Sequence, residues 1–159
     1  MTMEAKPARL SRTVQTQIVL NEHINGAGRL FGGRLMEWID VVAGVTARRH
    51  SGCEVTTAAV DSLEFHAPAH VNDTIVLEGR VTCTGRTSME VRVDTFVESL
   101  NGERKRVNRA YLVMVALDAE THQPAPVPPL LVESGEERAE WEAGIRRREL
   151  RSQRRRENL

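Results

Sequence analysis

The chain has 159 residues, of which 40% are hydrophobic and 28% charged, a composition typical of one soluble globular domain rather than a disordered or membrane-spanning chain. Its 22 basic residues balance 22 acidic ones, so the net charge gives no reason to expect nucleic acid or a membrane as partner. The two cysteines, Cys53 and Cys83, form no Cys-x-x-Cys pair. We expect free thiols in a cytoplasmic protein without a signal peptide.

The N-terminal part predicts a strand followed by a long helix. Thr13–Leu20 predicts a strand with Val14, Thr16, Ile18 and Leu20 on one face. A polar, glycine-rich loop occupies residues 21–31, and the spacing of apolar residues then predicts a helix from Gly33 to about His50. Because this helix is apolar over most of its circumference, we expect it to be buried on most sides.

Four further strands are predicted, over residues 55–65, 74–83, 88–100 and 104–118. The third shows the clearest alternation, with an inward set of Met89, Val91, Val93, Thr95 and Val97 and an outward set of Glu90, Arg92, Asp94 and Glu98. Turn signals such as Asn101-Gly102 separate the strands. Consecutive strands joined by short turns indicate an antiparallel meander, and hence an α+β fold.

A proline-rich segment closes this domain near residue 125, with prolines at 124, 126, 128 and 129. We therefore divide the chain into a domain over residues 10–125 and a proline-rich exit with a charged helix over 126–159. Ser134, with Glu137 three residues later, predicts the start of that helix. Its cluster of seven arginines between residues 146 and 156 is read as a solvated helix face, since nucleic-acid binding would need interleaved aromatic residues.

The loop before the first helix carries the residues best suited to chemistry. Gly32 and Gly33 allow close approach to a ligand, and amides at a helix start can donate to a developing negative charge. Asp40, two turns further on, can act as a general base on water or as a nucleophile. On spacing alone, however, the glycines could merely begin a helix, Asp40 could be a core acid, and Asn25 could be a turn residue.

Other kinds of site have less support in the sequence. His66 and His70 have the spacing of helical metal ligands, but Pro68 between them indicates a turn, so we expect no metal site. No serine or cysteine lies in a nucleophile elbow.

Several motifs together resemble one family. Asn25-x-x-Gly28-x-x-x-Gly32-Gly33-x-x-Met36-x-x-x-Asp40 resembles the opening signature of acyl-CoA thioesterases of the bacterial YciA and eukaryotic cytosolic acyl-CoA hydrolase type. Residues 55–65 followed by Pro68 resemble the family's second strand, and Gly85–Val91 resembles the entry to its fourth strand. The resemblance extends over roughly residues 10 to 150.

This resemblance implies a hotdog fold, in which a curled antiparallel sheet wraps a central helix, and hydrolysis of acyl-CoA to a free acid and coenzyme A. It implies that Asn25 and Asp40 are the catalytic pair. The Gly32 and Gly33 amides would polarise the thioester carbonyl. It also implies that Arg86, Thr87 and Ser88 line the coenzyme A groove, although these residues could simply form a tight turn. No cofactor is expected beyond the coenzyme A of the substrate.

The spacing of the site residues predicts a shared site. Asp40 lies seven residues past Gly33, about 10 Å along a helix, which is too far for both to reach one thioester easily. We therefore expect a homodimer in which Asn25 and the glycines of one chain face Asp40 of the other. The resemblance implies the same, with dimers assembling further into hexamers as trimers of dimers.

The sequence gives less support to two other functions. A non-catalytic acyl-CoA-binding hotdog sensor is the alternative from another class, although the residues outside 10–125 leave no room for a DNA-binding domain. A hotdog dehydratase or hydratase would need a histidine near the helix start. Phe31 precedes the two glycines instead, and His23 lies eight residues away.

Overall fold

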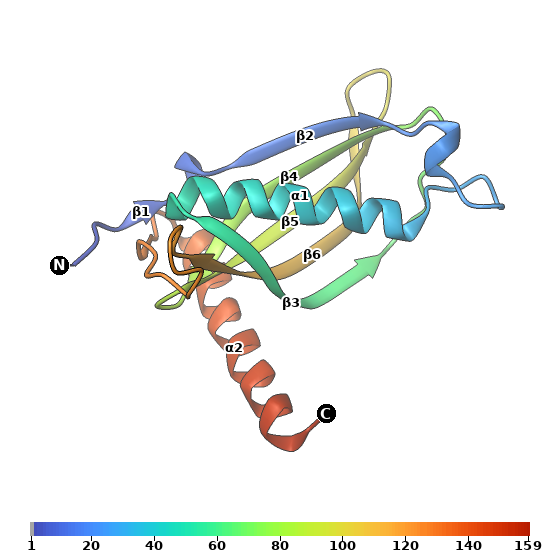
Figure 1. Ribbon diagram of the computed structural model, residues 1–159. Coiled ribbons are helices and arrows are strands. Elements are labelled where there is room, and N and C mark those ends of the chain that lie inside the picture. Colours follow the sequence, from blue (N-terminus) through green and yellow to red (C-terminus); the bar gives the residue numbers. More distant parts are fainter. Residues whose placement is uncertain (1) are drawn as a thin grey trace.

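A computed structural model describes residues 2–159. Its elements are β1 (Lys6–Pro7), η1 (Ala8–Leu10), β2 (Thr13–Ile18), η2 (Asn21–His23), α1 (Gly32–Ser51), β3 (Glu54–Phe65), β4 (Thr74–Thr84), β5 (Ser88–Glu98), β6 (Arg104–Leu117), β7 (Leu130–Leu131) and α2 (Gly135–Glu157). Five strands form one antiparallel sheet, and α1 lies across one of its faces (Figure 1). The predicted α+β hotdog architecture is confirmed.

The order of the strands departs from the simple meander that the sequence predicted. The sheet runs β2-β4-β5-β6-β3, so β4, β5 and β6 form a meander, while β3 pairs with β6 at the far edge. Residues 66–73 therefore carry the chain from one side of the sheet to the other. Short turns cannot reveal this, because a strand pairs with the neighbour that buries its apolar face and not necessarily with the next strand along the chain.

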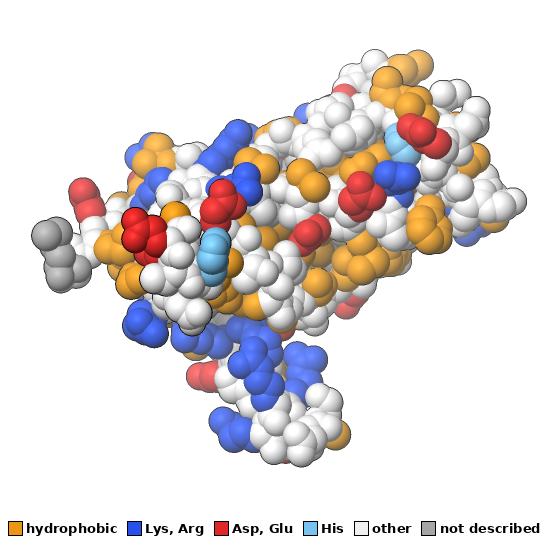
Figure 2. Space-filling model, in the orientation of Figure 1, with side chains coloured by type: hydrophobic (Ala, Val, Ile, Leu, Met, Phe, Trp, Pro, Cys, Tyr) orange, Lys and Arg blue, Asp and Glu red, His pale blue; other side chains and the backbone are white. Residues whose placement is uncertain are grey.

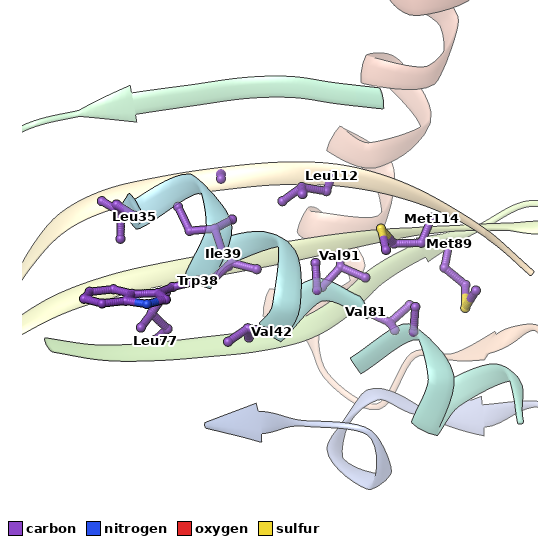
Figure 3. Packing of buried hydrophobic residues seen from close by; sticks show 14 of the residues in the cluster. Leu35, Trp38, Ile39, Val42, Leu77, Val81, Met89, Val91, Leu112 and Met114 are labelled. Carbon is purple, nitrogen blue, oxygen red and sulfur yellow. The ribbon is translucent and has the colours of Figure 1, made fainter. Parts of the chain in front are cut away.

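The core lies between α1 and the concave face of the sheet. Leu35, Trp38, Ile39 and Val42 of α1 pack against side chains of β4, β5 and β6, and Figure 3 shows this interdigitation. The inward residues expected of β5 are buried, since Met89, Val91, Val93 and Thr95 are each 0% exposed. The helix ends at Gly52, whose φ of 70° is the left-handed conformation that favours glycine at a helix end.

One side of α1 is not covered by its own chain, which corrects the expectation of burial on most sides. Met36, Glu37, Asp40 and Val41 are exposed, in contrast to the buried stripe on the opposite side of the helix. A five-stranded sheet curls around only part of a helix. The apolar residues on this uncovered side therefore indicate a further contact surface.

Strand β2 also turns its apolar side chains outward. Val14 and Ile18 are 47% and 54% exposed, whereas Thr13 and Val19 on the other face are buried. The alternation predicted a strand correctly, but it could not say which face meets α1.

The C-terminal helix α2 packs on the convex face of the sheet, opposite α1 (Figure 1). Glu90, Arg92 and Asp94 do point outward as predicted, yet α2 and neighbouring side chains leave them only 6–7% exposed. The reading of the arginine cluster as a solvated face was thus wrong in part, because Arg147 and Arg151 reach back to sheet carboxylates. Within residues 2–159, no helix combines the length and apolar character needed to cross a bilayer.

Candidate active site

The start of α1 presents free backbone donors. Phe31 precedes the helix without any capping bond from its side chain. Within the described residues, the Gly32 and Gly33 amides donate to no acceptor, whereas the Arg34 and Leu35 amides donate to the Phe31 carbonyl. Unpaired amides at the positive end of the helix dipole suit an oxygen that gains negative charge.

Asn25 organises the loop in front of this helix start. Its Oδ1 accepts hydrogen bonds from the amides of Ala27 at 2.9 Å and Arg29 at 3.3 Å, and its own amide donates to the Arg29 carbonyl. Gly28 adopts a φ of 74° in the tight turn between Asn25 and Arg29. The exposed Asn25 side chain keeps its Nδ2 hydrogens free of any partner in the described part of the chain, so this group can still donate to a ligand.

Asp40 lies midway along α1 and contacts the edge strand. Thr57 Oγ1 of β3 donates to Asp40 Oδ1 at 2.6 Å, a short bond typical of a hydroxyl facing a carboxylate. Asp40 is exposed, and is therefore not the core acid that its spacing alone allowed, because it belongs to the uncovered side of α1. Sequence reasoning missed Thr57, since no spacing rule relates a helix residue to a strand residue seventeen positions later.

Several apolar side chains of α1, of the residue before it and of β3 are exposed in the same chain as this carboxylate. Phe31, Met36, Val41, Val60 and Phe65 are each between 45% and 57% exposed. Figure 2 shows hydrophobic side chains spread over the face that carries α1, with single acidic residues between them. A carboxylate among exposed apolar groups is suited to a site that a second surface completes.

The two glycines differ in the space around them. A Cβ added to Gly33 would lie 2.7 Å from Phe31 Cε1, closer than carbon atoms normally approach, while one added to Gly32 would lie 3.7 Å from the Phe65 ring. The helix start is therefore lined by two aromatic rings, and a Cβ at Gly33, unlike one at Gly32, would displace the exposed Phe31 ring.

The predicted coenzyme A residues lie at the other end of the molecule. The Arg86 carbonyl accepts from the Val127 amide, next to Pro128, whose carbonyl contacts His50 at the end of α1. Gly33 begins that same helix. One chain therefore gathers the Asn25 loop and the glycine amides at one end of α1, and leaves Arg86, Thr87 and Ser88 at the other.

The cysteines offer no nucleophile at this place. Both are free, and burial raises the pKa of the Cys83 thiol to about 11, so it carries its proton near neutral pH. Among residues 2–159, no three histidine, cysteine, aspartate or glutamate side chains gather as metal ligands would. The described chain thus presents a carboxylate and its hydroxyl partner midway along α1, and an amide side chain with two free helix amides at the start of α1. These kinds of group suit attack by water on a carbonyl.

Comparisons with known proteins agree with this chemistry. Residues 27–102 match the model of the thioesterase superfamily. An uncharacterised acyl-CoA thioester hydrolase from Bacillus subtilis is 39% identical over 137 residues, which are 86% of this chain and 79% of that protein. The human cytosolic acyl coenzyme A thioester hydrolase is 36% identical over 121 residues, and these are only 31% of its length.

Solved structures are similar over nearly the whole chain. An apo-hexameric acyl-CoA thioesterase has a TM-score of 0.91 and 41% identity, with 96% of this chain and 97% of that chain covered. An acyl-CoA hydrolase from Staphylococcus aureus, solved with butyryl coenzyme A, coenzyme A and coenzyme A disulfide, has a TM-score of 0.91 and 32% identity over 97% and 94% of the two chains. Its structures include variants in which an asparagine, an aspartate or a threonine is changed to alanine.

Proposed function

This chain belongs to the acyl-CoA thioester hydrolases of the thioesterase superfamily, and we propose that it hydrolyses acyl-CoA with Asn25, Asp40 and the Gly32 and Gly33 amides at a site shared by two subunits. The products are a free acid and coenzyme A. We place it in the cytoplasm, in keeping with its cytosolic relatives.

The bond between Thr57 and Asp40 is the observation that carries this proposal. It fixes one carboxylate on the exposed side of α1, where a water molecule and a thioester can approach. The three residues changed in the Staphylococcus aureus hydrolase have the same types as Asn25, Asp40 and Thr57. They are also spaced alike, fifteen and then seventeen residues apart. Both observations support assigning the reaction to these three positions.

The proposed reaction follows from the groups present. The Asp40 carboxylate takes a proton from water, and the resulting hydroxide attacks the thioester carbon. The carbonyl oxygen becomes an oxyanion and receives hydrogen bonds from the Gly32 and Gly33 amides. The carbon–sulfur bond then breaks, and the coenzyme A thiolate leaves and is protonated. Asn25 Nδ2 orients either the water or the carbonyl. Direct attack by Asp40, giving a mixed anhydride that water then cleaves, uses the same geometry.

A second subunit resolves the separation between these groups. Gly33 and Asp40 are about 10 Å apart along α1, so the amides of one chain and its own carboxylate do not meet at one thioester. The exposed apolar surface around Asp40 supports packing of a partner there, with the two α1 helices antiparallel. Asp40 of the partner subunit then faces the glycine amides of the first. The hexameric state of similar thioesterases supports further assembly of such dimers.

The same arrangement accounts for the predicted coenzyme A residues. Arg86, Thr87 and Ser88 lie near the C-terminal end of α1 in their own chain. An antiparallel partner brings its copies of these residues to the end of α1 where the glycines lie. We assign them to the phosphates and pantetheine of coenzyme A, since guanidinium and hydroxyl groups bind phosphate oxygens well.

Mixing of two inactive variants tests the shared site. Asn25→Ala and Asp40→Ala homodimers should each be inactive toward an acyl-CoA ester. In a hybrid dimer, one of the two sites keeps both residues, so an equal mixture should recover about a quarter of wild-type activity. Release of coenzyme A, followed with a thiol reagent, measures this. No recovery after demonstrated subunit exchange would rule out sites built from two chains.

The enzymatic function itself is tested with a panel of acyl-CoA esters. Wild type should release coenzyme A from at least one of them, and Asp40→Asn should not. A protein that binds these esters without releasing coenzyme A would be a sensor rather than a hydrolase.

A further inference from the structure

We propose that residues 152–159, the C-terminal arm of α2, strap a second copy of this chain by docking on the convex face of that copy's β3. This inference rests on the proposed dimer, whose shared sites the strap would hold together. It assigns a role to the arginine cluster that the proposed catalytic reaction does not use.

The path of α2 across the sheet leads to the β3 edge. Glu140 contacts Arg92 of β5 and Tyr111 of β6, and Arg147 makes two hydrogen bonds to Glu90 of β5. Arg151 then pairs with Asp61 of β3 at 2.5 Å, and both side chains are largely buried. Because β3 is an edge strand, α2 has crossed to the end of its own sheet by residue 151.

Beyond Arg151, no part of the chain that the structure describes buries the arm. Every residue from 152 to 159 is exposed, and the hydrogen bonds of this segment stay within α2 in the described structure. The helix nevertheless continues to Glu157 and is closed by Asn158 in the left-handed conformation. Figure 1 shows this red end of α2 projecting away from the sheet, past β3. Six residues of helix extend about 9 Å, nearly two strand spacings in a sheet.

The edge that the arm passes is itself unpaired. Among the described residues, strand β3 pairs only with β6, which leaves the backbone groups of its outer side free. Val60 and Phe65 of β3 are 45% and 54% exposed, and Met36 and Val41 of α1 extend the same apolar surface. An edge strand of this kind is a template for a second chain. It is also the edge next to Thr57 and Asp40, so the proposed dimer places the partner here.

Charge complementarity favours a second β3 as the surface that the arm meets. The arm carries Arg154, Arg155 and Arg156 against a single Glu157. Strand β3 contains no lysine or arginine. Of its three acidic residues, Glu54 pairs with Arg48 and Asp61 with Arg151 of the same chain. The Glu64 side chain is 72% exposed, lies 3.9 Å from the His66 ring and has no lysine or arginine partner in the described residues. A basic arm leaving one β3 would therefore meet Glu64 on the next.

The helical repeat identifies the arginines that would make this contact. Arg147 and Arg151 face the sheet, and residues three and four positions later continue the same side of the helix. That side continues to Arg154 and Arg155. Arg146 and Arg156 point elsewhere on the helix, so they provide a control with the same change of charge.

The experiment compares Arg154→Glu/Arg155→Glu with Arg146→Glu/Arg156→Glu in the full-length chain. Sedimentation velocity over a dilution series measures the dimer dissociation constant. We expect it to rise about tenfold or more for the first pair and less than about twofold for the second, because ion pairs across an interface are worth more than solvated surface charges. Raising the salt concentration should weaken the wild-type dimer more than the dimer of the first variant.

The dependence of specific activity on enzyme concentration tests the strap separately from the proposal that two chains share each active site. The first variant should reach wild-type specific activity at high enzyme concentration and lose it on dilution before the control does. Equal dissociation constants for the two variants would overturn the strap. The same result would be found if the arm bound a different partner instead of a second copy of this chain. A raised dissociation constant with specific activity independent of concentration would retain the strap and count against sites shared between chains.

Discussion

Asp40 is exposed on α1, and its Oδ1 receives a hydrogen bond from Thr57. We predict that Thr57→Val lowers kcat roughly tenfold or more while KM changes little, because a hydrogen bond to a charged group is worth about 1.5–3 kcal/mol and here orients the base. Thr57→Ser keeps the hydroxyl and should retain most of the activity. Steady-state kinetics on one acyl-CoA ester measure both, and equal losses in the two variants would contradict an orienting role.

At Gly33, the addition of a single Cβ atom should lower activity. Alanine favours a helix over glycine by roughly 1 kcal/mol, so Gly33→Ala should not lower stability much. Its Cβ would nevertheless lie 2.7 Å from the Phe31 ring and displace that ring at the mouth of the site. We predict a clear loss of kcat/KM with a melting temperature close to wild type. Gly32→Ala, whose nearest atom is 3.7 Å away, is the matched control and should lose less.

Among the elements, α2 is held to the sheet mainly through polar groups that need close approach. Arg147 stacks on the Tyr111 ring at 3.7 Å while it donates to Glu90. Burial alone would lower the pKa of the Arg147 guanidinium, but the hydrogen bond to Glu90 and the charge of that carboxylate raise it overall. Gly144 allows the approach, because a Cβ there would lie 2.7 Å from Cys83 Cβ and 3.0 Å from Glu90 Oε1.

We therefore predict that Gly144→Ala destabilises the fold, despite the better helix propensity of alanine. Overpacking against a rigid strand costs about 1–3 kcal/mol, against a gain of roughly 1 kcal/mol from propensity. Urea unfolding should show a net loss of up to about 2 kcal/mol. Gly135→Ala on the same helix has open space around it and serves as control. Equal stability of the two variants would show that α2 is not closely seated on the sheet.

The sequence predicts contacts between residues that are close along the chain better than contacts between distant elements. The Ser134 cap was predicted from a local pattern, and its side chain does accept from the Glu137 amide, because capping involves residues only three apart. The burial of Glu90 and the pairing of Asp61 with Arg151 could not be predicted, since they depend on where α2 crosses the sheet. For the same reason the motif indicated Asp40 as a candidate, while its bond to Thr57 became visible only once β3 lay beside α1.

At the scale of the whole molecule, the features that one chain leaves incomplete gather along one edge. The uncovered side of α1, the unpaired edge of β3 and the end of α2 all face outward there. The C-terminal end of α1, by contrast, is covered by other parts of the chain. The His50 side chain is 1% exposed, its Nε2 contacts the Pro128 carbonyl at 2.8 Å, and Lys6 Nζ donates to the Arg49 carbonyl. The edge formed by α1, β3 and α2 is thus suited to assembly. The C-terminal end of α1, by contrast, holds the chain's N-terminal segment and proline-rich exit to the helix.

This covered end of α1 predicts how global stability responds to acid. Burial lowers the pKa of His50 below its ordinary value of 6.5, an effect that the bond to Pro128 only partly offsets. The unfolded chain therefore binds the His50 proton more readily than the folded chain. The stability linked to His50 is fully present above about pH 6.5 and is lost as the pH falls toward the lower folded-state value, by at most about 1.4 kcal/mol per pH unit.

His50→Gln keeps a donor for the Pro128 carbonyl and removes the titrating group. We predict that its urea midpoint falls less steeply than that of wild type between pH 6.5 and pH 5, even if the variant is less stable at pH 7.5. His122→Gln, in an exposed loop, is the control and should keep the wild-type slope. Parallel profiles for all three proteins would mean that the folded and unfolded chains bind the His50 proton equally, with no lowering of its pKa. That result is incompatible with its buried Nδ1, which has no hydrogen-bond partner among the described residues, because a charged group left unpaired there would strongly destabilise the fold.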